Sequence, residues 1–262
     1  LSRLRQAGIV PIMFYLQFEN TPSHLVFQSE LESDHEILLC RSTSTDPATG
    51  KETQRLLLDM RVQLTGRQGS GNPASLGFET GDFPRVPAGR MRGLQVLTRP
   101  VAPPGERQVT ELPPNANLLQ VHPFTEPYPV PEHLQTIPPG YTQMPATEWE
   151  RSTSVWGLPN TDVNQHVNVH EYIYGGENQV SRLLHAAGLP IDRHLITKAA
   201  LLFRKPFFPG QVYRMQGPLW TQGARTLVVT TFHLVSRDGS VEPRPSVAVR
   251  MEGIVGGEGS GA

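Results

Sequence analysis

An internal repeat constrains the fold of this chain more than any other feature of its sequence. Residues 1–8 read Leu-Ser-Arg-Leu-Arg-Gln-Ala-Gly, and residues 180–188 read Val-Ser-Arg-Leu-Leu-His-Ala-Ala-Gly. Each segment is typical of the end of an amphipathic helix that is closed by a glycine. A pattern that returns in this way indicates a fold built twice from one unit.

Apolar segments follow both helix ends in the same order. They are rich in β-branched and aliphatic residues, so each predicts a β-strand. The matched pairs are 15–18 with 201–203, 37–40 with 227–230, and 56–60 with 247–251. The same succession of helix end and strands, found twice, predicts two related units in one chain.

The second copy contains a complete helix, which we predict over about residues 169–187. Gly175 and Gly176 weaken this prediction near the helix start, because glycine is a poor helix former. The first copy opens at its helix end, so we expect its helix and leading strand to lie before Leu1. The apolar positions of the second helix follow the i, i+3, i+4, i+7 spacing of a buried face: Val180, Leu183, Leu184 and Ala187.

One long helix followed by antiparallel strands predicts an α+β unit in which a sheet wraps around a helix. More than half of the 25 prolines lie between Pro84 and Pro145, which is typical of a connecting segment. We expect one short strand within it, near residues 93–97. The predicted organisation is a first unit at 1–66, a Pro/Gly-rich connection at 67–147, a second unit at 148–255 and a flexible tail at 256–262.

Composition excludes several classes of function. The net charge is −1, so nothing favours binding to nucleic acid or to an anionic membrane. No apolar run approaches the roughly 18 residues of a membrane span. The single cysteine, Cys40, lies in an apolar run and is expected in the core. Without paired cysteines or an H-E-x-x-H pattern we predict no metal and no cofactor, and a cytoplasmic location.

Residues 156–172 carry the most chemical information in the sequence. Asp162, Asn164 and His166 alternate, so an extended backbone would place them on one face. They precede the predicted helix, whose positive end favours developing negative charge. A carboxylate, an amide and an imidazole there can polarise a carbonyl and activate water. The same residue types are also ordinary at helix starts, and Asn168 fits a helix N-cap.

The segment Asp162-Val-Asn-Gln-His-Val-Asn168, followed by Tyr172, resembles the D-x-N-x-H-V-N-N segment of plant and bacterial acyl-acyl-carrier-protein thioesterases. The resemblance extends through Met251 and implies a double hotdog fold, with two sheets each wrapped around a helix. It implies that Asp162, Asn164 and His166 are the catalytic residues. Substrate binding is expected at four further positions: Asn168, Tyr172, Arg204 and Lys205.

Two departures from the family pattern bear on catalysis. Val169 replaces the second asparagine of the family's pair. In addition, Pro206 and Phe207 occupy the neighbourhood where the family has an acidic residue or a cysteine. Asp162 then serves as the base, a group on the first unit does so, or the activity is weak or lost.

Three functions remain open from the sequence. The first is hydrolysis of an acyl thioester carried on an acyl carrier protein or coenzyme A, in fatty-acid or polyketide metabolism. The second is a hotdog hydratase or dehydratase, a group that carries D-x-N-P-x-H and a strand similar to residues 203–210. The third is a non-catalytic acyl-binding protein. In each case the expected partner is a phosphopantetheine thioester, and a homodimer of double hotdogs is compatible with the resemblance. Arg204 and Lys205 are either solvated strand-end charges or ligands of a pantetheine phosphate.

Overall fold

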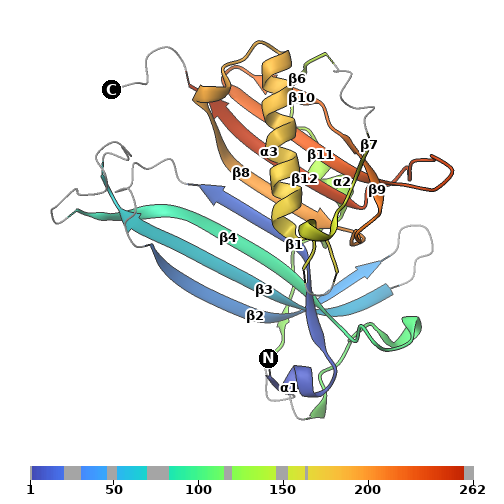
Figure 1. Cartoon of the computed structure of the whole chain (residues 1–262). Coiled ribbons are helices and arrows are strands. Elements are labelled where there is room, and N and C mark those ends of the chain that lie inside the picture. The colour runs from blue at the N-terminus through green and yellow to red at the C-terminus, as the bar shows by residue number, and fades with distance from the viewer. Residues whose placement is uncertain are drawn as a thin grey trace. The chain divides into compact units, whose positions relative to one another are not determined.

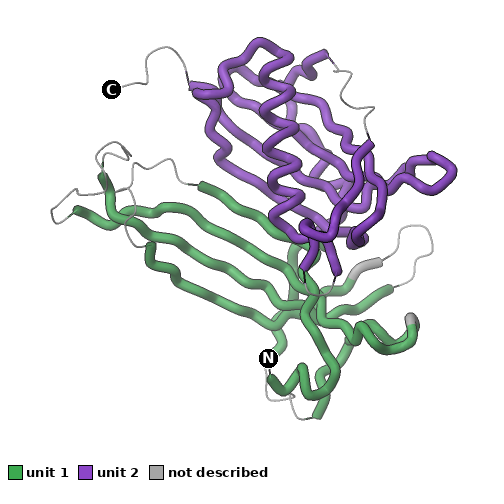
Figure 2. Tube along the Cα trace, viewed as in Figure 1, with its two compact units in different colours: residues 1–128 green, residues 129–262 purple. Residues whose placement is uncertain are grey.

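The computed structural model describes residues 2–20, 31–45, 52–69, 83–114, 120–145, 153–162 and 165–256 (Figure 1). The chain divides into two compact units, residues 1–128 and 129–262 (Figure 2). The predicted tail at 256–262 lies outside the described residues apart from Gly256. No helix in the described ranges is long and apolar enough to cross a membrane.

The first unit is a curved antiparallel sheet preceded by a short helix. Its sheet has the order β5-β2-β3-β4-β1, in which only the β2–β5 pairing is parallel. Its described elements are α1 (Ser2–Gln6), β1 (Val10–Asn20), β2 (Glu32–Thr45), β3 (Glu52–Arg67), β4 (Arg85–Thr98), the 3₁₀ turn η2 (Pro104–Glu106) and β5 (His122–Pro123).

The second unit is an antiparallel sheet with one long helix, α3, lying across it (Figure 1). Its sheet has the order β8-β12-β11-β10-β6. β10 pairs with residues 225–228 of β11, β9 pairs with residues 231–235 of the same strand, and β7 pairs with β9. Its described elements are α2 (Pro131–Gln135), β6 (Thr142–Gln143), β7 (Thr153–Val155), η5 (Leu158–Asn160), α3 (Val169–Ala186), η6 (Ile191–Arg193), β8 (His194–Phe203), β9 (Val212–Gln216), β10 (Leu219–Gln222), β11 (Arg225–Val235) and β12 (Val247–Val255).

The two predicted helix ends are confirmed, and they have the same geometry. Gly8 and Gly188 both adopt a φ of 68°, in the left-handed region that glycine enters without steric cost. In each case the N–H of the following residue donates back across the last turn. The two closing bonds are Ile9 N–H to Leu4 O and Leu189 N–H to Leu184 O, both 2.9 Å.

The first strand match of the repeat, β1 with β8, agrees with the structure, whereas the two later matches are displaced by one strand. The last strand of each unit pairs with the strand that follows its helix, β4 with β1 and β12 with β8. The counterpart of β3 is therefore β11, and that of β2 is the interrupted strand β9–β10. The segment expected as a short strand at 93–97 is the 14-residue strand β4.

The unit boundaries follow from the position of β4. Because β4 lies between β3 and β1, the first unit extends past residue 66, where the sequence placed its end. The second unit begins before residue 148, because α2 is bound to its sheet. Arg250 on β12 donates to the carbonyls of Leu134 and Thr136 at 3.1 and 2.6 Å.

The two units have the same strand order, which makes this chain an α+β double hotdog, as the sequence predicted. The described helix of the first unit is α1.

The face of α3 that meets the sheet includes three of the four predicted apolar positions, Val180, Leu183 and Leu184, all buried. Ala187 is half-buried and forms the C-cap. The two glycines that weakened the helix prediction lie where α3 comes closest to the strands. A Cβ on Gly175 would lie 2.9 Å from Cζ of Phe232, which is closer than real Cβ contacts allow. The helix therefore uses glycine to approach the sheet.

We expect Gly175→Ala to destabilise the protein although alanine is the better helix former by about 1 kcal/mol. Overpacking against the buried Phe232 ring costs roughly 1–3 kcal/mol, so the net loss is about 1 kcal/mol. Chemical denaturation measures the change. Glu177→Ala, at an exposed position of the same helix, is the control and should stay within about 0.5 kcal/mol. A more stable Gly175→Ala protein would contradict the close-approach argument.

A buried carboxylate joins the central strands of the first unit. Asp59 on β3 has a side chain that is only 2% exposed. Arg92 on β4 donates from both Nε and Nη2 to its two oxygens at 2.8 Å, and Arg61 adds bonds at 2.9 and 3.2 Å. Burial alone would raise the pKa of Asp59, but the hydrogen bonds and charges of Arg92 and Arg61 outweigh it and lower the pKa. Cys40 is buried nearby in the core of this unit, as predicted.

Replacing Asp59 with asparagine should destabilise the protein by about 3 kcal/mol at neutral pH, because it leaves Arg92 and Arg61 without their shared anion. The pKa of Asp59 is lower in the folded state than its usual value of about 3.9. Its contribution is therefore complete above about pH 4 and is lost as the pH falls through the folded pKa. Unfolding free energies of wild type and Asp59→Asn should converge below about pH 4, while the exposed control Asp34→Asn should follow wild type throughout. A constant difference across this range would contradict the assignment.

Candidate functional site

The segment that carries the predicted catalytic residues forms a tight hairpin ahead of α3. Asp162 and His166 face each other, with the Asp162 N–H donating to the His166 carbonyl at 2.8 Å. Next to them, Thr161 and Val167 form a β-bridge. Gln165 turns the chain with a φ of 62°. Asn164 lies outside the described residues, so its position in the hairpin stays a prediction.

The side chain of Asp162 stabilises this hairpin. Its Oδ1 accepts the N–H of His166 at 3.0 Å, and the residue is otherwise exposed. The His166 ring packs edge-on against Phe208, with ring centroids 5.1 Å apart. Two of the three predicted catalytic residues, Asp162 and His166, are thus neighbours joined by hydrogen bonds.

Asn168 occupies the N-cap position of α3, as the sequence suggested. Its side chain makes no capping hydrogen bond; instead its carbonyl accepts the N–H of Glu171 at 3.1 Å. The preceding residue, Val167, donates its N–H to the carbonyl of Phe207 at 2.9 Å. The hairpin is therefore tied to both the helix and the segment after β8. A role for Asn168 in substrate binding stays a prediction.

Tyr172 lies in the aromatic core of the second unit and is 1% exposed. Its ring meets Trp156 at 5.4 Å, Phe203 at 5.4 Å and Phe232 at 5.3 Å, each edge to face. Burial raises the pKa of Tyr172, so the phenol stays protonated. Trp156 is buried in the same core. Contact between Tyr172 and a substrate stays a prediction, and in the structure its ring anchors α3 to the sheet.

Arg204 and Lys205 at the end of β8 form ion pairs with one carboxylate. The Lys205 Nζ lies 2.6 Å from Oε1 of Glu242, and Arg204 Nη2 lies 2.8 Å from Oε2. The Lys205 hydrogen bond, followed by that of Arg204, lowers the pKa of Glu242. Arg204 also donates to the carbonyl of Pro245 at 2.7 Å. These contacts are those of strand-end charges that hold the β11–β12 connection, and contact with a pantetheine phosphate stays a prediction.

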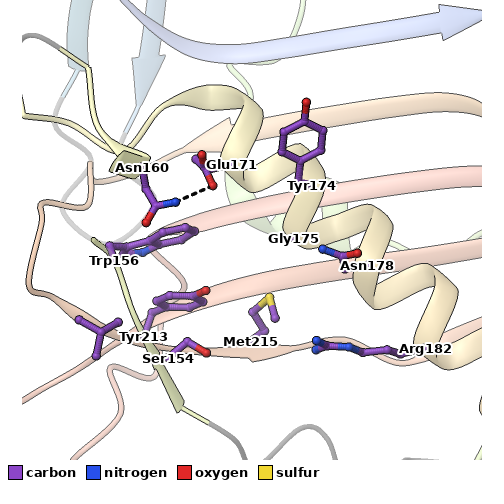
Figure 3. A pocket seen from close by; sticks show the side chains of 11 residues that line it. Ser154, Trp156, Asn160, Glu171, Tyr174, Gly175, Asn178, Arg182, Tyr213 and Met215 are labelled. Carbon is purple, nitrogen blue, oxygen red and sulfur yellow. Dashed lines mark hydrogen bonds between the residues drawn. The ribbon is translucent and has the colours of Figure 1, made fainter. Parts of the chain in front are cut away.

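A pocket that the sequence did not indicate lies between α3 and the strands β7 and β9 (Figure 3). Its volume is about 310 Å³, at the lower end of the range for ligand sites. Polar groups from helix and strands converge on it. Residues that line it include Ser154, Trp156, Asn160, Glu171, Asn178 and Tyr213.

Glu171 lines this pocket and supplies a carboxylate to it, five residues after His166 of the hairpin. Its side chain is 20% exposed, and Asn160 Nδ2 donates to Oε2 at 2.9 Å. The other oxygen lies 3.1 Å from Nε2 of His170. Asn160 is itself oriented, because its Oδ1 accepts the N–H of Gly157 at 2.9 Å. The available signal was a glutamate three residues after the N-cap, a position from which it often bonds back to the loop.

The fold is similar to two solved thioesterases. One is a candidate oleoyl thioesterase from Lactobacillus plantarum, with a TM-score of 0.52 and 10% identity over 97% of this chain and 78% of that protein. The other is the 12:0-ACP thioesterase from Umbellularia californica, with a TM-score of 0.51 and 13% identity over 97% of this chain and 76% of that protein. No protein-family model and no curated protein sequence matches. At these identities the similarity is one of fold.

Proposed function

We propose that this protein hydrolyses acyl thioesters of phosphopantetheine. The observation that carries the proposal is the pairing of Asp162 with His166 on a hairpin immediately before the long helix of a hotdog unit. The fold is shared with two proteins named as thioesterases. The finer proposals are an acyl carrier protein or coenzyme A as the carrier, a cytoplasmic location, a place in fatty-acid or polyketide metabolism, and a homodimeric assembly.

Hydrolysis requires attack of water on the thioester carbonyl carbon. The C–O bond that forms converts the carbonyl to an oxyanion, which collapses as the C–S bond breaks and the thiolate takes up a proton. We assign the orientation of carbonyl and water to His166 and Asn164. The N-terminus of α3, directly after the hairpin, favours the negative charge that develops on the carbonyl oxygen.

The proton of the attacking water needs an acceptor. Phe207 cannot supply one, since it is an apolar side chain buried in the aromatic core, and Pro206 beside it has no titratable group. Asp162 and Glu171 are the two carboxylates that flank the start of α3. Glu171 is partly buried and held in place by Asn160, so we propose it as the general base. Asp162 fixes the hairpin through Oδ1, and we propose that its negative charge helps His166 to orient the attacking water.

Asp162→Asn and His166→Ala should each lower kcat by roughly 10²-fold, the typical contribution of a general acid–base or orienting group. Asparagine keeps an oxygen that can accept the His166 N–H, so the melting temperature should be nearly unchanged. The measurement is thiol release from acyl-coenzyme A and acyl-carrier-protein substrates, beside the exposed control Asp192→Asn.

A purely structural hairpin predicts the opposite pattern: stability lower by about 1 kcal/mol with turnover retained. Product analysis of the wild-type protein decides among the functional classes. Free thiol supports hydrolysis, an enoyl or 3-hydroxyacyl thioester identifies a hydratase or dehydratase, and tight binding with no turnover identifies an acyl-binding protein.

Glu171→Gln tests the assignment of the base. Glutamine keeps the shape of the side chain and an oxygen for the Asn160 amide, but it cannot take up a proton at neutral pH. We expect kcat to fall by roughly 10²-fold or more with little change in KM. Glu177→Gln, six residues further along α3 and exposed, should retain full activity. Full turnover in Glu171→Gln would restrict this residue to holding the loop.

A further inference from the structure

We infer that the pocket along α3 binds the phosphopantetheine arm of the substrate, with its thioester end at Glu171 and its phosphate end at Arg182. The choice of this ligand rests on the proposed function, whereas the pocket and its polarity are features of the structure. The sequence had offered Arg204 and Lys205, at the end of β8, either as phosphate ligands or as solvated charges.

One stripe of α3 provides the helix wall of the pocket. Glu171, Gly175, Asn178 and Arg182 all line it, and they follow the i, i+4, i+7, i+11 spacing of a single helix face. Figure 3 shows Asn178 and Arg182 following one another along the helix, opposite the strand that carries Tyr213 and Met215. Along this wall the carboxylate of Glu171 is followed by Gly175, which has no side chain, and then by the amide of Asn178 and the guanidinium of Arg182.

The length of this wall matches the proposed ligand. Glu171 and Arg182 are three helical turns apart, which at 1.5 Å per residue is roughly 16 Å. The phosphopantetheine chain from sulfur to phosphorus has about as many atoms as four to five amino-acid residues, so it spans roughly 16 Å when extended. An arm anchored by its phosphate at Arg182 brings its sulfur to the start of α3, beside the hairpin.

The opposite wall suits a chain that alternates amides with apolar groups. Tyr213 and Ser154, which pair across the β7–β9 ladder, place two hydroxyl groups there, and hydroxyls both donate and accept. Burial raises the pKa of Tyr213, so its hydroxyl keeps its proton for donation. Trp156 stacks on the Tyr213 ring at 4.2 Å with an interplanar angle of 14°. This aromatic pair and Met215 provide the apolar surface for the methylene and dimethyl groups of the arm.

The position of Arg182 in the pocket and the chemistry of its guanidinium favour it as the phosphate ligand. Arg182 is exposed at the far end of the pocket, and its charge reaches Tyr213, whose pKa it lowers slightly against the effect of burial. Its guanidinium can donate two parallel hydrogen bonds to a phosphate. Arg204 and Lys205 do not line this pocket; both are ion-paired with Glu242 at the end of β8.

Calorimetric titration of the whole chain with 4′-phosphopantetheine and with pantetheine tests the inference. Wild type should bind the phosphorylated compound at least 10-fold more tightly, the usual gain from a charge-assisted hydrogen bond. Arg182→Gln should remove this preference and leave the affinity for pantetheine within about twofold. Arg193→Gln, an exposed arginine just after the helix, is the matched control and should keep the preference.

Equal affinity of wild type for the two compounds, or a preference that survives in Arg182→Gln, overturns the inference. If Arg204→Gln instead loses the preference for 4′-phosphopantetheine over pantetheine, the phosphate binds at the end of β8. Thiol-release assays on the same proteins separate this result from the proposed function. Binding that depends on Arg182 without any hydrolysis refutes the thioesterase and leaves the pocket assigned, while hydrolysis with an unchanged preference in Arg182→Gln refutes the pocket alone.

Discussion

The organisation of the second unit depends on the close approach of α3 to its sheet. Gly175 and Gly176 leave no room for a Cβ against Phe232, Val249 and Met251, so the helix backbone lies nearer to the strands than larger residues would permit. Tyr172 fills the space one turn earlier within the aromatic core. This contact fixes the axis of α3, and with it the position of the hairpin at one end and the direction of the polar stripe along its side.

The sequence predicted those features of the fold that are encoded locally. Helix periodicity and a terminal glycine identified α3 and both helix ends, because these signals arise within a few residues. Strand β4 was underestimated because Pro87, Gly89 and its three arginines give it no alternation of apolar residues. What holds β4 in the sheet is pairing with β3 and β1 and the ion pair of Arg92 with Asp59, 33 residues away. Such partners become visible only when the register is known.

In the candidate site, too, the sequence was informative about neighbours along the chain and not about partners that are far apart in it. The alternation of Asp162 and His166 predicted one face of an extended segment, whereas the chain turns at Gln165 and backbone hydrogen bonds bring the two residues together. The roles of Arg204 and Lys205 depended on Glu242, which lies 37 residues or more further along the chain, and the sequence did not connect them. Glu171 and Arg182 were missed for a related reason. Their stripe on α3 looks like an ordinary solvated face until strands β7 and β9 are placed opposite it.

Two partly or fully buried acids show how the surroundings of a carboxylate determine what it can do. Asp59 is held by two guanidinium groups, so a proton on it would leave two cations without their anion, and its role is structural. Glu171 is held by the neutral amide of Asn160, and its second oxygen lies 3.1 Å from Nε2 of His170. A proton arriving at Glu171 therefore disrupts one neutral hydrogen bond and no obligatory ion pair. Of these two acids, Glu171 is therefore the one that we propose as the base.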